Sequence, residues 1–209
     1  MKNAKDFWNK SAPKYAKRKV RDEAVYQKKL AITQDHFDKD WNVLEFGCGT
    51  GTTAITHAPF VNHILAIDIA ETMLEIARDK AQQADVENIE FKEGTLASTG
   101  LQPASFDAVL GLNVMHLMEN LEDEVKRVYE LLKPNGIFVS STALIGQLNM
   151  LWQLVIPAMQ RLNFAPYVNR FTKDELCTIL LNAGFSIEYE WQPEKDSVFI
   201  VARKPDSES

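Results

Sequence analysis

The sequence predicts an α/β protein in which a doubly wound, mostly parallel sheet is covered by helices on both faces. Two observations lead to this prediction. Short apolar or β-branched runs alternate with segments of helical periodicity as far as residue 142, as a series of βαβ units requires. The chain then ends in two more strand patterns joined by a short polar link, which predicts an antiparallel hairpin.

The parallel part contains five expected strands. They are residues 42–46 (NVLEF), 63–68 (HILAID), 89–94 (IEFKEG), 106–113 (FDAVLGLN) and 136–142 (GIFVSST). Helices are expected from Glu71 and from Leu121, because apolar residues recur there every three or four positions. The sequence KPNG ends the second helix.

Beyond Thr142 the pattern changes. Residues 148–162 predict a helix that is apolar on more than one face, so it must be covered. Core packing, a substrate lid, a dimer face and a membrane surface are the alternatives for that cover. Thr172 and Glu175 have the spacing of a capping box, and Gly184 ends that helix. Strands follow at 186–191 and 197–204.

Composition narrows the class of protein. The formal charge of −6 argues against non-specific nucleic-acid binding. Residues 14–21 are a local exception, because they carry five basic side chains and no acid. This basic segment fits a solvated face, a site for an anionic substrate or a contact with a membrane surface. The N-terminus lacks the apolar core of a signal peptide and no segment is long enough to span a bilayer, so a cytoplasmic protein is expected. Cys48 and Cys177 form no CxxC pair, and neither a disulfide nor a metal site is expected.

The turn after the first strand reads GCGTGTT and predicts a ligand lying against exposed backbone. Its glycines, Gly47, Gly49 and Gly51, follow GxGxG spacing, and Thr52 stands where a dinucleotide fingerprint needs a third glycine. No lysine lies between Lys39 and Lys80, which excludes a P-loop for triphosphates.

Two acidic residues flank this turn. Glu45 would repel phosphates but suits an ammonium group. Asp68 lies 21 residues beyond Gly47, near the spacing at which a carboxylate accepts hydrogen bonds from both ribose hydroxyls. The site therefore favours a nucleoside with a free ribose diol, a cationic amine and no pyrophosphate. S-adenosylmethionine fits this description.

The segments VLEFGCGTG, AIDIAETML, FDAVLGLNVMHLM and ELLKPNGIFVSST resemble, in order and spacing, motifs I, II, IV and V of the class I S-adenosylmethionine-dependent methyltransferases. The similarity is to the small-molecule branch that includes ubiquinone and menaquinone biosynthesis methyltransferases, and it covers about residues 40–142. It implies the Rossmann-like methyltransferase fold, three layers around a seven-stranded sheet in the order 3-2-1-4-5-7-6 with an antiparallel last strand.

The resemblance also assigns roles. The glycine turn, including Cys48, would let the backbone approach the cofactor, Glu45 would lie near the methionine amine, and Asp68 would hold the ribose. Residues expected around the adenine or closing the site are Tyr15, Ile69, Met73, Thr95, Leu96 and Asn113. Tyr15, Ile69 and Met73 are alternatively packing residues, and Thr95 stands where the family commonly has Asp. His116 is the candidate for acid–base chemistry, with a structural role as its alternative.

The resulting prediction is methyl transfer from S-adenosylmethionine to a small-molecule acceptor, with S-adenosylhomocysteine as product. Alternatives are a lipid or quinone acceptor and a non-catalytic S-adenosylmethionine-binding module. GxGxG spacing disfavours a nicotinamide dehydrogenase, and the acidic charge and lack of NPPY or DPPY disfavour a nucleic-acid methyltransferase.

One domain over 1–209 is expected, with N-terminal helices in 1–40 and an insertion at 145–170 covering the substrate side. Expected partners are limited to the acceptor, with peripheral membrane contact open, in a monomer or homodimer.

Overall fold

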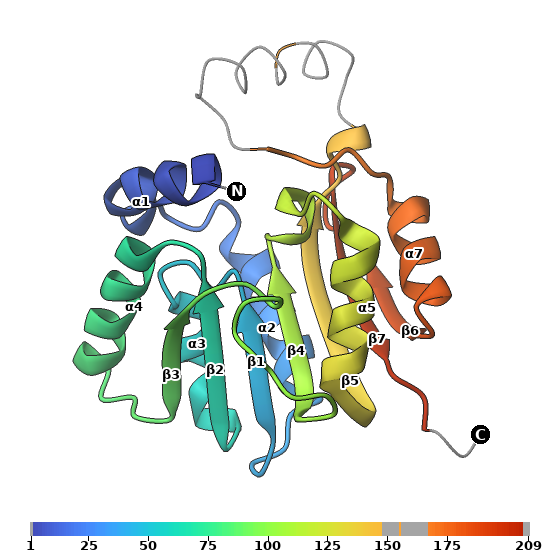
Figure 1. The fold of residues 1–209 in the computed structure, drawn as a ribbon, viewed down its shortest axis with the longest axis horizontal. Coiled ribbons are helices and arrows are strands. Elements are labelled where there is room, and N and C mark those ends of the chain that lie inside the picture. The colour runs from blue at the N-terminus through green and yellow to red at the C-terminus, as the bar shows by residue number, and fades with distance from the viewer. Residues whose placement is uncertain (1, 148–154, 156–166, 207–209) are drawn as a thin grey trace.

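The computed structural model describes residues 2–147, 155 and 167–206, and its elements follow the predicted alternation (Figure 1). In chain order they are α1 (Lys2–Ala16), α2 (Glu23–Gln34), β1 (Asn42–Phe46), α3 (Thr52–His57), the 3-10 turn η1 (Ala58–Phe60), β2 (His63–Asp68), α4 (Glu71–Gln83), β3 (Ile89–Glu93), β4 (Phe106–Leu112), η2 (Met115–Leu117), α5 (Leu121–Leu131), β5 (Leu132–Ala143), η3 (Ile145–Gln147), α7 (Lys173–Asn182), β6 (Ser186–Trp191) and β7 (Ser197–Arg203). The helix expected over 148–162 lies, apart from position 155, outside the described residues.

The strands form one sheet in the order β3-β2-β1-β4-β5-β7-β6. Neighbouring strands from β3 to β5 are parallel, and β7 runs antiparallel to both β5 and β6. This topology confirms the predicted order. The chain changes direction across the sheet between β1 and β4, and ligands of open α/β sheets bind at the carboxyl ends of the strands at such a point. Figure 1 shows α1 lying along that edge.

The hydrophobic core has two halves because successive side chains of a strand point to opposite faces. On one face Val43 of β1 packs in a cluster with Ala54 of α3 and Leu74 of α4. On the other face Leu44 belongs to a cluster with Val125 of α5 and Leu176 of α7. The predicted three layers are confirmed, and Glu45 follows Leu44 on the face of α3 and α4.

The capping box of α7 forms as the sequence predicts. The Glu175 N–H donates to Thr172 Oγ1 at 3.3 Å, and the Thr172 N–H donates to Glu175 Oε2 at 2.8 Å. The helix ends before Gly184, whose φ of 101° suits a glycine. Local side-chain chemistry fixes both ends of this helix.

The fifth strand begins earlier than predicted. Leu132 is buried and pairs with Phe106 of β4, whereas the next regular pair joins Ala108 to Ile137, so residues 133–136 form an irregularity inside the strand. Lys133 Nζ donates to the Asp107 carboxylate at 2.8 Å across this irregularity. Pairing with a distant strand therefore extends β5 through the KPNG sequence, which local propensity alone assigns to a turn.

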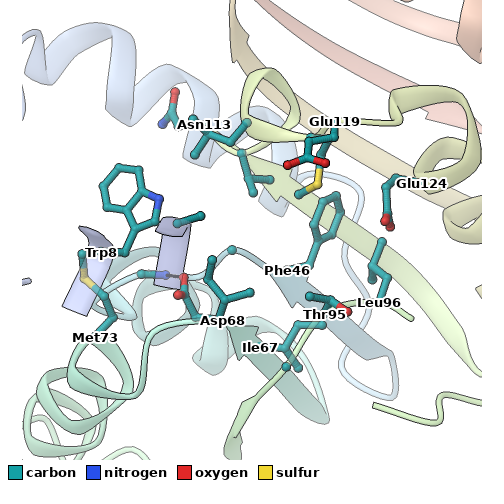
Figure 2. A pocket seen from close by; sticks show the side chains of 18 of the residues that line it. Trp8, Phe46, Ile67, Asp68, Met73, Thr95, Leu96, Asn113, Glu119 and Glu124 are labelled. Carbon is teal, nitrogen blue, oxygen red and sulfur yellow. Dashed lines mark hydrogen bonds between the residues drawn. The ribbon is translucent and has the colours of Figure 1, made fainter. Parts of the chain in front are cut away.

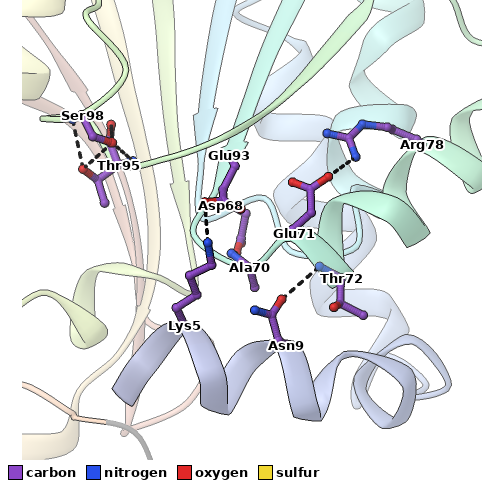
Figure 3. A network of polar contacts seen from close by, with 10 residues as sticks. All are labelled: Lys5, Asn9, Asp68, Ala70, Glu71, Thr72, Arg78, Glu93, Thr95 and Ser98. Carbon is purple, nitrogen blue, oxygen red and sulfur yellow. Dashed lines mark hydrogen bonds and ion pairs between the residues drawn. The ribbon is translucent and has the colours of Figure 1, made fainter. Parts of the chain in front are cut away.

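Helix α1 is docked on the start of α4 (Figure 3). The N-cap residue of α4, Ala70, has no side chain that can accept a hydrogen bond, and Asn9 Oδ1 of α1 instead accepts from the Thr72 N–H at 3.0 Å. Lys5 Nζ of α1 also pairs with Glu93 Oε1 at the end of β3, at 2.5 Å. These contacts hold α1 above the carboxyl ends of β2 and β3.

Candidate functional site

A cavity of about 330 Å³ opens at the carboxyl ends of β1, β2 and β4, below α1 (Figure 2). Of the residues predicted for the site, those that line it are Tyr15, Gly47, Gly49, Asp68, Ile69, Met73, Thr95, Leu96 and Asn113. The structure thus brings together groups from α1, the glycine turn and the ends of four strands. Glu45, Cys48, Gly51 and His116 are not part of the lining.

The glycine turn forms one wall of the cavity with its backbone. A Cβ on Gly47 would lie 2.4 Å from Val114 Cγ2, whereas a Cβ on Gly49 would meet nothing closer than Tyr15 Cε1 at 3.8 Å. Both residues have a left-handed backbone, with φ of 64° and 54°. Gly47 is therefore required by packing against the segment after β4, and Gly49 leaves space that belongs to the cavity.

Gly51 has a different role in the same turn. It is the N-cap of α3 with φ of 70°, and a Cβ there would lie 2.8 Å from Ala77 Cβ and 3.0 Å from Phe91 Cε1. Its missing side chain allows α3 to begin directly against α4 and β3. The requirement for glycine at this position is close packing of helices on the sheet.

Asp68 links the glycine turn to α4. Its Oδ2 accepts from the Gly49 N–H at 2.8 Å and its Oδ1 from the Ala70 N–H at 2.9 Å. Burial raises the pKa of this carboxyl, and the backbone N–H groups of Ala70, Gly49 and Ile69 oppose that shift. Each carboxylate oxygen keeps a second lone pair for a ligand in the cavity. The residue is therefore both a structural acceptor and a wall of the site.

Glu45 lies buried beside the turn, with 3% of its surface exposed. Its Oε2 has no hydrogen-bond partner among the described residues. Burial, and then the charge of Asp68, raise the pKa of the Glu45 carboxyl to about 8. A buried polar atom without a partner is unfavourable, and a cationic ligand would relieve both the missing hydrogen bond and the repulsion between the two acids.

The sequence is similar to those of known methyltransferases. The model of the methyltransferase domain family matches residues 43–136, which contain the glycine turn, Asp68 and β4. The chain is 31% identical over 123 residues to the uncharacterized methyltransferase YcgJ of Bacillus subtilis, covering 57% of this chain and 49% of that protein. It is 30% identical over 112 residues to a demethylmenaquinone methyltransferase of Leptospira interrogans, covering 51% of this chain and 45% of that protein. Over residues 43–136 the chain is thus similar to methyltransferases.

The chain spans about half the length of these curated relatives. The crystal structure of YcgJ superposes with a TM-score of 0.72 at 17% identity, covering 87% of this chain and all of that one. The crystal structure of the [4+2]-cyclase SpnF superposes with a TM-score of 0.71 at 15% identity, covering 91% of this chain and 86% of that one. The shared fold therefore includes a protein named for a reaction other than methyl transfer, and activity must be argued from the site.

Cys48 is a packing residue of the turn. Its side chain is 8% exposed, and its N–H donates to the Ile67 carbonyl at 3.1 Å, joining the turn to β2. Burial, with the charges of Glu45 and Asp68, raises the pKa of the thiol well above its ordinary value. The thiol is therefore protonated and is a poor nucleophile.

Thr95 uses its side chain within its own turn. Thr95 Oγ1 accepts from the Ser98 N–H at 3.2 Å, and Ser98 Oγ accepts from the Thr95 N–H at 2.8 Å (Figure 3). Leu96 beside it is 4% exposed and lines the cavity. At the position where the family commonly has Asp, this chain presents a Thr whose hydroxyl is already engaged.

His116 connects two elements behind the cavity. Its Nδ1 lies 3.2 Å from Thr142 Oγ1 of β5, and its carbonyl accepts from the Asn169 N–H at 2.7 Å. Burial lowers the pKa of the imidazole to about 4, so the ring is neutral at pH 7. These contacts attach η2 to β5 and to the segment before α7.

Residues that the sequence analysis did not identify form much of the remaining lining. They are mainly apolar and come from α1, β1, β4 and the segment after β4: Ala4, Trp8, Phe46, Leu112, Val114, Leu117 and Met118. Figure 2 shows Trp8 and Met73 on one side of the cavity and Leu96 and Glu124 on the other. Ala4, Trp8 and Tyr15 are four and seven residues apart, a spacing that places them on one face of a helix and could have identified them.

Among residues 2–147 and 167–206, no three His, Cys, Asp or Glu side chains are grouped as metal ligands would be. Within the same ranges no helix has both the length and the apolar character needed to cross a membrane.

Proposed function

We propose that this protein transfers the methyl group of S-adenosylmethionine to a small-molecule acceptor. The observation that carries the proposal is the buried Glu45 carboxyl, whose Oε2 has no partner within the described part of the chain and which lies close enough to Asp68 for the two charges to interact. A ligand with an ammonium group at one end and a ribose diol at the other would satisfy both acids. S-adenosylmethionine has both groups.

The residues of the cavity fit such a cofactor. Asp68 would accept hydrogen bonds from the ribose hydroxyls, and the Gly49 backbone leaves room for close approach. Ile69 and Leu96 offer apolar surfaces for the adenine. Thr95 Oγ1 already accepts from the Ser98 N–H, so one lone pair of this hydroxyl is left for the adenine amine. We propose these roles on the basis of position, burial and hydrogen-bond capacity.

When bound, S-adenosylmethionine supplies a methyl group on a positively charged sulfur, which is a good leaving group. The chain then contributes orientation and the exclusion of water, effects that reach about 7 to 11 kcal/mol in well-aligned reactions. Phe46, Val114 and Met118 make one wall apolar, and α1 contributes Trp8 and Tyr15 to the lining. His116 contacts Thr142 and lies outside the lining, so the proposal gives it a positioning role.

The acceptor proposed first is a small molecule, because the cavity is limited to about 330 Å³ and has to accommodate the cofactor as well. A quinone or lipid is the second candidate, since one relative is a demethylmenaquinone methyltransferase. A module that binds S-adenosylmethionine without turnover is the third. Formation of S-adenosylhomocysteine with a panel of acceptors distinguishes an enzyme from this third alternative.

The cofactor assignment is tested by thermal melting with S-adenosylhomocysteine or NAD. A ligand at about 100 times its dissociation constant adds about 2.7 kcal/mol of stability, which raises the melting temperature by several degrees. We expect this increase with S-adenosylhomocysteine and no increase with NAD. Equal stabilisation by NAD would contradict the assignment.

A further inference from the structure

A second, smaller cavity lies on the α2 side of the sheet. It has a volume of about 40 Å³ and shares Leu112 and Asn113 with the larger cavity. Six of the lining residues, from α2, α3 and β5, carry polar groups: Tyr26, Lys29, Thr33, Thr53, His57 and Ser141. Among the described residues, no Asp or Glu side chain belongs to the lining. The cavity is thus rich in hydrogen-bond donors at the carboxyl end of β4.

Lys29 is the cationic group of this cavity. Its side chain is half-buried, and its Nζ donates to Ser141 Oγ at 2.8 Å. In the described ranges no carboxylate lies within ion-pair distance of Lys29. The charge of Glu194 reaches the ammonium, but the Glu194 carboxylate pairs with Arg21 at 3.5 Å. Burial lowers the pKa of Lys29, and the charge of Glu194 opposes that shift.

Two further polar groups of the lining have no partner. Tyr26 Oη and His57 Nε2 are buried and make no hydrogen bond within the described part of the chain. The His57 side chain is fully buried, and its other ring nitrogen, Nδ1, lies 3.3 Å from Gln34 Nε2. The half-buried ammonium of Lys29, the phenol of Tyr26 and the imidazole of His57 therefore line one small space, and none of the three pairs with a carboxylate in the described part of the chain.

We propose that this smaller cavity is a carboxylate-binding subsite with the Lys29 ammonium as its cation. A water molecule needs about 10 to 15 Å³ measured in this way, so a cavity of about 40 Å³ has room for a group of a few heavy atoms. It is too small for a ring system. Because Asn113 borders both cavities, the rest of the ligand would extend past Asn113 into the larger one.

The inference rests on the proposed function and makes it more specific. The carboxylate has two chemical sources: a methyl acceptor that is an organic acid, or the amino-acid end of S-adenosylmethionine itself. Both require the same cation and the same donors. The experiment therefore has one arm for each source.

The first arm measures binding of phenylacetate and hexanoate, and of the matching primary amides, by calorimetry or ligand-detected NMR with S-adenosylhomocysteine present. If the acceptor supplies the carboxylate, the acids bind and the amides do not. Lys29→Met weakens acid binding about ten- to a hundredfold, as expected for loss of a charge-assisted hydrogen bond. Lys28→Met is the control, because Lys28 lies on the same helix over the Trp191 ring and outside the cavity.

The second arm compares S-adenosylhomocysteine with 5′-methylthioadenosine, which lacks the amino-acid end. If the cofactor supplies the carboxylate, Lys29→Met weakens binding of S-adenosylhomocysteine and leaves binding of methylthioadenosine unchanged. Ser141→Ala should give a smaller loss in whichever arm responds. Thermal melts of all variants establish that they fold.

The inference is overturned if acids and amides bind equally or not at all and Lys29→Met leaves S-adenosylhomocysteine binding unchanged. The cavity would then hold ordered water only. Should Lys29→Met fail to fold, Ser141→Ala and the comparison of acids with amides on the unaltered protein decide the question. Failure of the proposed function gives a different result, because neither S-adenosylhomocysteine nor 5′-methylthioadenosine would bind. Binding of the acids would then be measured without these two ligands.

Discussion

At the scale of single residues, Asp68 has two functions, and any substitution affects both of them. Its carboxylate accepts the N–H groups of Gly49 and Ala70, and it is also the group proposed to hold the ribose. An asparagine has the same size and one carbonyl oxygen, so it can satisfy only one of these N–H groups well. Its amide nitrogen would then face the second N–H.

We therefore expect Asp68→Asn to weaken S-adenosylhomocysteine binding about ten- to a hundredfold, because charge-assisted hydrogen bonds contribute about 1.5 to 3 kcal/mol. Calorimetric titration measures the affinity, and a melt establishes that the variant is folded. Asp79→Asn, the same change at an exposed position of α4, is the control and should bind normally. Unchanged affinity in Asp68→Asn would limit Asp68 to its structural contacts.

The residues that could be predicted from the sequence are those whose partners are close in the chain or fixed by motif spacing. Gly47, Gly49 and Asp68 were placed in the lining in this way. Trp8 and Phe46 were not, because their position at the cavity depends on how α1 and β1 pack. The engagement of Thr95 by Ser98 was also missed, although a Ser three residues after a Thr is a local signal for such a turn.

At the scale of secondary-structure elements, the glycine turn allows a matched comparison. Gly49 and Gly51 both have a left-handed backbone, so alanine at either position costs about 1 to 2 kcal/mol of strain. Only Gly51→Ala also forces a Cβ against Ala77 and Phe91, and overpacking adds about 1 to 3 kcal/mol.

We expect Gly51→Ala to lower the melting temperature more than Gly49→Ala does. We expect Gly49→Ala to lose more affinity for S-adenosylhomocysteine, because its Cβ would occupy the cavity. Melting and calorimetric titration of the two variants measure the two effects. If both variants lost stability and affinity in the same proportion, the separation of roles within the turn would be wrong.

Helix α1 gives a second prediction at this scale. Asn9 supplies the hydrogen bond that the N-cap of α4 lacks, and α1 carries Trp8 and Tyr15 to the cavity. Asn9→Ala should destabilise the protein by about 0.5 to 2 kcal/mol, as removal of a capping side chain does. It should also weaken S-adenosylhomocysteine binding, because α1 would be held less firmly. Lys10→Ala, a neighbouring exposed residue, is the control.

Helices and strands, like single residues, could be predicted where local sequence determines their limits. β1, β2 and β6 have the predicted limits because their apolar runs end at turn sequences. The start of β5 was missed because it depends on pairing of Leu132 with Phe106. The position of α1 was not predictable either, since Asn9 and Lys5 contact residues more than sixty positions away.

At the scale of the whole molecule, buried titratable groups determine how stability depends on pH. His57 and His116 both have a pKa lowered by burial to about 4. For a group with a lowered pKa, the folded state binds fewer protons than the unfolded state, so stability is lost as pH falls from about 6.5 to 4. Glu45 acts in the opposite direction, since its pKa is raised from 4.5 to about 8. Its contribution is lost as pH rises through that range.

Because two histidines oppose one carboxyl below pH 6.5, the protein without ligand should be most stable near pH 6.5 and should lose stability on both sides. An ammonium group beside Glu45 favours the ionised carboxylate, so S-adenosylhomocysteine should raise the melting temperature more at pH 8 than at pH 5.5. Melts across this range, with and without the ligand, measure both effects. Glu45→Gln should remove the loss of stability toward pH 8, together with most of the pH dependence of ligand stabilisation, and leave the acid side unchanged. If the ligand stabilised the unaltered protein equally at both pH values, Glu45 would not be the partner of the ammonium group.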